Sequence, residues 1–348
     1  MKKALVALSA ASALAILVPG TAEAAFTLKV IDNADDCGDI NSVAFDGTNI
    51  HLAWVCNTAS GDVVKYAKGT PGGTSFPKEI ISDVTTTGTK FTSVASNGGL
   101  VFEVNGSIRY ARPVAAGTGD CPDNDAWSCE LVGSGHDPQI SVGPSNVYIT
   151  YHNDSGSVIM AKRSGIATYT FTTVFTGSSG VSGRFPLIDA SDTTAGVWIG
   201  YEHDVSSGFA SEVSMWSPTE GTESATGLSH YILHGMSVNH GLHQPQVVSG
   251  NKLYVRASDG SWSSSTYATS ATSIGDVDDY GGYQVITRGG TNGLIATKKG
   301  IFGGWTDVLV DGAIDSGFSS LVVNQSNGAY YISYYDQTNQ QLKLARGS

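Results

Sequence analysis

The sequence predicts an all-β fold, a β-propeller of seven blades. Three observations lead to this prediction. The chain is rich in glycine, with 43 residues, and only 14% of its residues are charged. No stretch sustains the 3.6-residue period of a helix. A triplet of short β-rich runs recurs along the chain, the first after a polar turn, the second ending in aromatic residues and the third ending in Ala with a basic residue.

Three copies of this triplet are the clearest, and they are spread over the whole chain. They cover residues 42–45, 50–54 and 63–68; residues 139–142, 147–151 and 158–162; and residues 321–323, 330–334 and 342–346. A shorter copy spans 93–112, where Asn105-Gly106 has the form of a two-residue hairpin turn. A longer copy spans 187–216.

The spacing of the copies predicts blades of four strands. First strands are expected to begin near Val43, Val94, Ile140, Ile188, Val247 and Leu321, with one more copy between the last two. The mean spacing is about 46 residues, which suits a four-stranded blade. Outer strands are expected at 79–82, 129–132 and 305–309. The pattern is weakest from Lys252 to Gly290, where 261–273 could hold an irregular strand, so six blades are an alternative.

The two ends of the chain predict how the ring closes. The chain ends on a third-strand copy, whereas residues 26–31 form a strand that belongs to no triplet. We expect this N-terminal strand to supply the outer strand of the last blade, because closure removes an exposed sheet edge.

Residues 1–24 have the form of a signal peptide. Lys2 and Lys3 precede an apolar run over 4–18, and Ala22-Glu23-Ala24 provides the small residues of a cleavage site. The run is shorter than the roughly 20 residues that span a bilayer. We therefore expect no membrane insertion, a single domain over residues 25–348, and a secreted protein, extracellular or periplasmic.

The charge of the chain argues against nucleic acid as a partner. The formal net charge is −12, and no cluster of Lys and Arg is present. Binding to a polyanion depends on such a cluster. Motifs of serine hydrolases, P-loops, dinucleotide sites and zinc proteases are also absent from the sequence. We expect a soluble monomer with an extracellular glycan or a protein as its partner.

The four cysteines fit an oxidising compartment. Their spacing favours one disulfide between Cys37 and Cys56 and another between Cys121 and Cys129. A zinc site or a free thiol nucleophile is not expected from this pattern.

One segment resembles a known superfamily. Tyr331-Ile332-Ser333-Tyr334-Tyr335-Asp336, followed by Leu342-Lys343-Leu344-Ala345, resembles the repeats of bacterial sialidase-like propellers. That superfamily includes sialidases, polysaccharide lyases and noncatalytic glycan-binding proteins, so the resemblance implies a fold without selecting an activity. Asp-box motifs are absent, with Ser258–Trp262 only a contracted version. Arg184-Phe185-Pro186 resembles the arginine-x-proline signature of sialidases, but it falls in a middle blade.

Candidate ligand-binding residues follow from propeller geometry. Turns that enter the inner strands and turns that follow the second strands open on the same side of the ring. The first set contains Asp39, Lys90, His136, Arg184 and His243, and the second contains His152, Tyr201, Glu202, His203, Tyr335 and Asp336. His and Arg there suit uronate chemistry or sugar binding, and Trp54, Tyr151 and Tyr335 could add aromatic surfaces. Glu202 with Asp204 or Asp336 could form a catalytic carboxylate pair.

Two sets of residues suggest a divalent metal, although no cofactor is required by the sequence. His230, His234, His240 and His243 lie within fourteen residues and could contribute to a zinc or copper site. Asp120, Asp123 and Asp125, in the loop between Cys121 and Cys129 and just before it, could bind calcium through oxygen ligands. Exposed histidines and an acidic surface turn are the simpler alternatives.

Two functions remain open from the sequence. The first is a noncatalytic binding protein that uses the loop side of the ring to hold a glycan or a protein. The second is a carbohydrate-active enzyme, a polysaccharide lyase or a sialidase-like glycosidase, that uses His136, Arg184, His243 and neighbouring Tyr and carboxylate groups. The missing Asp boxes favour binding.

Overall fold

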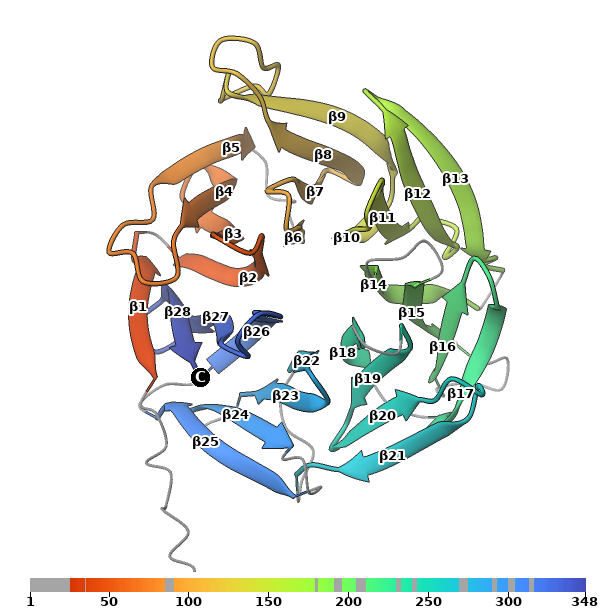
Figure 1. Ribbon diagram of the computed structural model, residues 1–348. Helices are drawn as coiled ribbons and strands as arrows, with labels where there is room; N and C mark the ends of the chain where they lie inside the picture. Colours follow the sequence, from red (N-terminus) through yellow and green to blue (C-terminus); the bar gives the residue numbers. More distant parts are fainter. Residues whose placement is uncertain are drawn as a thin grey trace, which may run out of the picture.

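The computed structural model describes residues 26–34, 36–84, 91–178, 181–190, 196–204, 211–229, 233–239, 243–268, 275–289, 293–299, 304–312 and 316–348. These residues form 28 strands in seven antiparallel sheets of four strands each. The sheets are arranged as blades around a central axis (Figure 1). The predicted seven-bladed propeller is therefore confirmed, and the six-bladed alternative is excluded.

The first three blades follow the order of the chain. Blade 1 contains β2 (Asp36–Phe45), β3 (Ile50–Thr58), β4 (Gly61–Gly69) and β5 (Lys78–Val84). Blade 2 contains β6 (Thr92–Val94), β7 (Leu100–Val104), β8 (Ser107–Pro113) and β9 (Trp127–Ser134). Blade 3 contains β10 (His136–Val142), β11 (Val147–His152), β12 (Val158–Gly165) and β13 (Thr168–Phe175).

The next three blades repeat this arrangement. Blade 4 contains β14 (Gly183–Ala190), β15 (Val197–Asp204), β16 (Ser211–Ser217) and β17 (Gly221–Ser229). Blade 5 contains β18 (Leu233–Val238), β19 (Pro245–Ser249), β20 (Lys252–Arg256) and β21 (Trp262–Thr266). Blade 6 contains β22 (Val277–Tyr280), β23 (Tyr283–Arg288), β24 (Leu294–Lys299) and β25 (Trp305–Asp311).

Blade 7 joins the two ends of the chain. It contains β26 (Ser316–Val323), β27 (Tyr330–Asp336), β28 (Gln341–Gly347) and, as its outer strand, β1 (Thr27–Asp32). β1 pairs antiparallel with β28, with Leu28 opposite Ala345. The predicted closure by the N-terminal strand is confirmed, and it covers the edge that β28 would otherwise expose.

The inner strand predicted for blade 5 was wrong. Val247 was predicted to begin an inner strand, but it lies in β19, the second strand, and the inner strand is β18. The reason is that β19 is an uninterrupted buried run and looks like an inner strand, whereas β18 contains a histidine and a glycine. The other predicted starts do lie in inner strands, and the predicted outer strands correspond to β5, β9 and β25.

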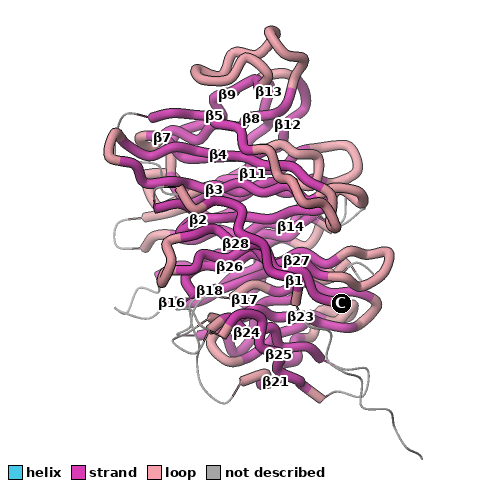
Figure 2. The backbone as a smooth tube through the Cα atoms, turned by 90° about the vertical axis from the view of Figure 1, so that its left-hand side faces the viewer, coloured by secondary structure: helices cyan, strands magenta, loops and turns pink. Residues whose placement is uncertain are grey.

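Strand direction divides the turns between two faces of the ring. The strands run across the ring from one face to the other, so turns gather on both sides (Figure 2). We define the loop face as the face that holds the turns entering the inner strands and the turns following the second strands. Because successive strands are antiparallel, these two kinds of turn lie on the same side.

Neighbouring inner strands are tied together around the axis. The hydroxyl groups of Ser320, Ser42, Ser93 and Ser141 each accept a hydrogen bond from a backbone amide of the next blade, namely Val43, Val94, Ile140 and Ala190. Asp189 and Asp278 do the same for Val238 and Val323, at 2.7 Å each. Short polar side chains near the axis therefore satisfy backbone donors that no strand pairing reaches.

A repeated ion pair joins blades farther from the axis. An acidic residue on one outer strand contacts a basic residue on the third strand of the next blade. The pairs are Asp32–Lys65 at 3.0 Å, Glu130–Arg163 at 2.6 Å, Glu223–Arg256 at 2.7 Å and Lys343–Asp311 at 3.0 Å. The partners are 32 or 33 residues apart in sequence. Buried aromatic residues such as Trp54, Trp127 and Trp198 fill the spaces between blades beside these pairs.

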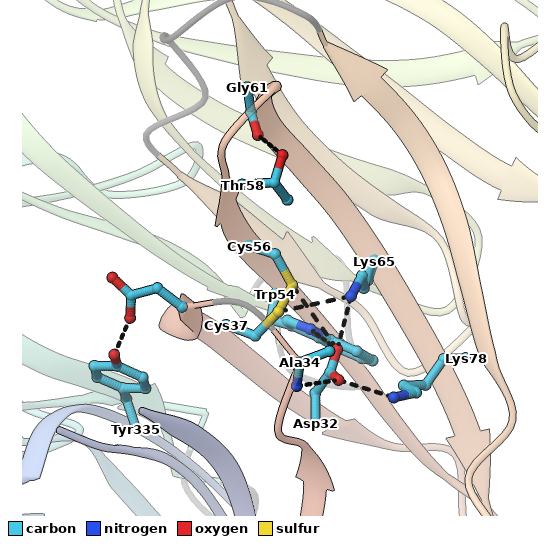
Figure 3. The surroundings of a disulfide bond; sticks show 11 residues. Asp32, Ala34, Cys37, Trp54, Cys56, Thr58, Gly61, Lys65, Lys78 and Tyr335 are labelled. Atoms are coloured by element: carbon cyan, nitrogen blue, oxygen red, sulfur yellow. Dashed lines mark hydrogen bonds and ion pairs between the residues drawn. A yellow bond between two sulfur atoms is a disulfide. The ribbon is translucent and has the colours of Figure 1, made fainter. Parts of the chain in front are cut away.

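Both predicted disulfides are present, and the described residues contain no other cysteine. Cys37–Cys56 joins β2 to β3 across one sheet, and Figure 3 shows it beside the buried carboxylate of Asp32. Cys121–Cys129 holds the loop before β9. Disulfides of this kind fit an oxidising compartment.

Among the described residues no helix is long and apolar enough to cross a membrane.

Candidate functional site

Matching β-bulges shape the entrance of several inner strands on the loop face. The register shifts between His136 and Gln139 in β10, and between Arg184 and Leu187 in β14. The residue after each of these two starts has a positive φ, 54° at Asp137 and 47° at Phe185, and a proline follows it. A bulge bends the strand and redirects a side chain. The segments 136–138 and 184–186 therefore occupy equivalent positions, and the bulges turn His136 and Arg184 toward the loop face.

Each bulge sets its first residue opposite the end of the second strand. His136 lies opposite His152, and Arg184 lies opposite Glu202. The same position holds Cys37 opposite Cys56 in blade 1, and Ser316 opposite Asp336 in blade 7. One structural position thus carries a disulfide in one blade and a pair of imidazoles in another.

The two imidazoles of blade 3 lie in contact. The ring centroids of His136 and His152 are 5.4 Å apart. His136 Nδ1 lies 2.7 Å from Glu103 of blade 2, and its Nε2 lies 3.1 Å from Asp154. His152 Nδ1 lies 3.3 Å from Asp137. His136 is therefore held between two carboxylates, whereas His152 Nδ1 is buried and has no hydrogen-bond partner among the described residues.

The two imidazoles titrate in opposite directions. The hydrogen bond with Glu103 is the main reason that the pKa of His136 is raised above its usual value of 6.5. Burial, together with the charges of His136 and Arg184, lowers the pKa of His152 to about 4. At neutral pH His152 is therefore an uncharged imidazole, and the charge of Arg184 contributes to keeping it so.

Arg184 extends this group into blade 4. Its guanidinium contacts the carboxylate of Asp204, and its side chain is 44% exposed. Glu202 behind it is buried, accepts a hydrogen bond from the Leu233 amide at 2.7 Å, and has a raised pKa because of burial. Phe185, next along the chain, is 43% exposed. We call the group formed by Glu103, His136, Asp137, His152, Asp154, Arg184, Phe185 and Asp204 the His–Arg cluster.

A second group of predicted residues lies across the axis, where blade 7 meets blade 1. The Tyr335 hydroxyl donates a hydrogen bond to Asp36, an interaction drawn in Figure 3. Asp39 is half-buried beside it, and burial raises the pKa of its carboxyl group. Asp336 is fully buried and lies 2.6 Å from Lys343. Asp336 therefore holds the blade together and is not offered to a ligand.

The aromatic residues predicted to face a sugar are buried. Trp54 has no exposed surface, and Tyr151, Tyr201 and Tyr335 are each at most 5% exposed. They pack between blades, because the end of a second strand lies against its neighbour in the ring. His203 is half-buried and bonds to Ser214 at 3.0 Å. A catalytic carboxylate pair was predicted from Glu202 with Asp204 or Asp336. Glu202 and Asp336 are buried, so neither pair offers two exposed carboxylates to a substrate.

The correction at blade 5 moves His243 to the other side of the ring. It lies in the turn between β18 and β19, after an inner strand, and therefore opposite the loop face. His230, His240 and Lys90 fall outside the described residues, and His234 lies within β18. The predicted histidine metal site therefore stays a prediction.

One group of three potential metal ligands converges among the described residues, formed by Asp32, Cys37 and Cys56. Both cysteines are in a disulfide, so this is no metal site as it stands. Asp120, Asp123 and Asp125 form no such group. An open hollow of about 710 Å³ lies beside that loop, between it and β5, at the outer edge of blades 1 and 2. None of the residues that line it belongs to the His–Arg cluster.

Four members of the cluster were not predicted from the sequence as site residues, namely Glu103, Asp137, Asp154 and Phe185. Glu103 is 2% exposed and interrupts the apolar strand β7, just before the Asn105-Gly106 turn. A lone charge in an otherwise buried strand was the available signal. Phe185 was read only as part of a motif, and its exposure depends on the positive φ of the bulge.

No known family profile and no curated protein matches this sequence. Solved structures do match in fold. A protein from Lactobacillus plantarum aligns with a TM-score of 0.52 and 10% identity, over 85% of this chain and 94% of that one. Two structures of Trypanosoma rangeli sialidase with difluorinated ligands align at TM-scores of 0.45 and 0.47, with 11% and 12% identity. This chain spans about half of those sialidase chains, covering 53% of each. These similarities concern the fold alone.

Proposed function

We propose that this protein is a secreted glycan-binding propeller and that the His–Arg cluster is its binding site. The observation that carries the proposal is that donors and acceptors from blades 2, 3 and 4 gather on the loop face, where the charge of Arg184 acts on His152 and the exposed Phe185 follows Arg184 in the chain. Sugars are bound by this combination, because hydroxyl groups need hydrogen-bond partners and the ring faces are apolar. The predicted signal peptide and the two disulfides support secretion.

Retention on immobilised polysaccharides tests this proposal. Replacing both His136 and Arg184 with Ala should weaken retention, with a loss of at least tenfold in affinity. Lys68→Ala is a matched control, because Lys68 is an exposed cation whose nearest carboxylate is Asp46, in a turn on the opposite face. Equal retention by the double variant and the native protein would contradict the proposal, and a protein partner would then replace a glycan.

One observation favours catalysis as a second candidate. His152 stays uncharged at neutral pH and lies near Arg184, whose charge acts on its pKa. A neutral imidazole can accept a proton while a cation stabilises a uronate carboxylate, as polysaccharide lyases require. Absorbance of unsaturated uronate products measures this reaction. Turnover that disappears in His152→Ala would establish the enzyme, and retention without turnover would support the binding function.

A further inference from the structure

The His–Arg cluster carries more negative than positive charge. Four carboxylates, those of Glu103, Asp137, Asp154 and Asp204, contact its basic side chains. At most two groups oppose them at neutral pH, Arg184 and His136, because burial lowers the pKa of His152 to about 4. Lys90 lies outside the described residues. The described part of the cluster is therefore net negative, in a chain whose formal charge is already −12.

The cation best placed for an acidic ligand is already occupied. Asp204 contacts the Arg184 guanidinium from the end of β15, in the same blade. A carboxylate on a sugar could pair with Arg184 only by displacing Asp204, or by lying beside it against like-charge repulsion. Like charges in one interface oppose binding strongly. His136 is covered in the same way, between Glu103 and Asp154.

The same groups are well suited to uncharged sugars. Asp154 is 80% exposed and Asp204 is 33% exposed, so their oxygens can accept hydrogen bonds from neighbouring hydroxyl groups. Arg184 contributes donors, because its side chain is 44% exposed. Phe185, the next residue in the chain after Arg184, is 43% exposed and offers an apolar surface. Charged groups paired with each other can bind a diol without a net charge on the ligand.

We infer that the His–Arg cluster selects neutral, hydroxyl-rich glycans and excludes acidic ones, with Asp204 as the residue that determines this specificity. The inference rests on the proposed function, since it names the class of glycan that the same site binds. Replacing Asp204 with Asn keeps the shape of the side chain and removes its charge. The exposed cation Arg184 then becomes available to a carboxylate.

Matched polysaccharides test the inference. The probes are polygalacturonate, alginate and hyaluronan, each immobilised beside its carboxyl-reduced form, and a sialylated glycoprotein beside its desialylated form. We expect the native protein to bind a neutral member at least tenfold more tightly than its acidic partner. Salt should change this retention little, because no net charge on the ligand is screened. Tighter binding to acidic members would overturn the inference while leaving the proposed function intact, and retention on none would overturn both.

The Asp204→Asn variant provides the second part of this test. Asp204→Asn should lose several-fold in retention on the neutral probe and gain at least tenfold on its acidic partner, with the gain falling as salt is raised. Lys68→Ala should behave as the native protein in both assays. Circular dichroism of each variant establishes that the fold is intact. If Asp204→Asn leaves the ratio of neutral to acidic binding unchanged, Asp204 does not determine specificity.

Discussion

At the scale of single residues, the surroundings of each carboxylate decide what it does. Glu103 is 2% exposed and Asp154 is 80% exposed, yet both contact His136. An ion pair in a low-dielectric interior is screened far less than one in water. Glu103 should therefore govern the charge of His136, and Asp154 should contribute little to it.

This difference is measurable by titration. Glu103→Gln should lower the pKa of His136, because the hydrogen bond with Glu103 is the largest cause of its raised value. Asp154→Asn is the matched control and should shift it less. Imidazole proton signals followed by NMR from pH 5 to pH 9 report both values. Equal shifts in the two variants would mean that burial of Glu103 does not strengthen the pair.

Asp276 makes a second residue-scale case, near the axis. Burial raises the pKa of its carboxyl group to about 7, although it accepts hydrogen bonds from the Leu321 and Val277 amides at 2.9 and 2.8 Å. A raised pKa in the folded state favours the protonated form. The stability it contributes is full below the unfolded value near 4 and is lost as pH rises toward 7.

Asp276→Asn removes this dependence. Relative to the native protein, the variant should gain stability as pH rises from 4 to 8, by at most about 4 kcal/mol for a shift of this size. Asp278 also has a raised pKa through burial, so the comparison must be the difference between the two proteins and not the native curve alone. Urea unfolding at pH 4 and pH 8 measures it. A pH-independent difference would show that Asp276 is not the titrating group.

At the scale of strands and turns, the sequence predicts the repeat better than the site. Alternation, aromatic endings and turn residues locate the inner strands of blades 1 to 4 and 7, because these features depend on local burial. The bulges that aim His136 and Arg184 arise from pairing with the next strand. Contacts such as Glu103 with His136 join different blades, so no local pattern contains them.

Gly135 shows how an element positions the site. It precedes β10 with a φ of 156°, and a Cβ atom there would lie 2.2 Å from the carbonyl oxygen of His152. Gly135→Ala should force β10 and β11 apart where His136 faces His152, with several-fold loss of glycan retention. Gly117→Ala, at another positive-φ turn with open space around its Cβ, is the control. A fully active Gly135→Ala protein would show that the spacing of these strands is unimportant.

At the scale of the whole molecule, ring closure depends on the contacts of β1. Asp32 at its end has no exposed side-chain surface and lies 3.0 Å from Lys65 and 2.8 Å from Lys78, both in blade 1. Trp54 also donates to it at 3.1 Å (Figure 3). Related ion pairs occur at four of the seven junctions between blades, and the pair at Asp32 lies where β1, the outer strand of blade 7, meets blade 1.

This junction should be the acid-sensitive point of the ring. Burial opposes ionisation of Asp32, but hydrogen bonds from Lys78 and Lys65 outweigh it and lower its pKa. A lowered pKa gives stability that is present above the unfolded value near 4 and is lost as pH falls below it. Asp32→Ala leaves Lys65 without its buried partner, and a loss of about 3 kcal/mol at pH 7 is expected. The loss should shrink toward pH 3, where the native carboxyl is also protonated.

Asp307→Ala, which removes an exposed partner of Arg288, is the control and should cost about 1 kcal/mol or less. If both variants unfold alike at pH 7, closure does not depend on this contact, and backbone pairing between β1 and β28 must carry it.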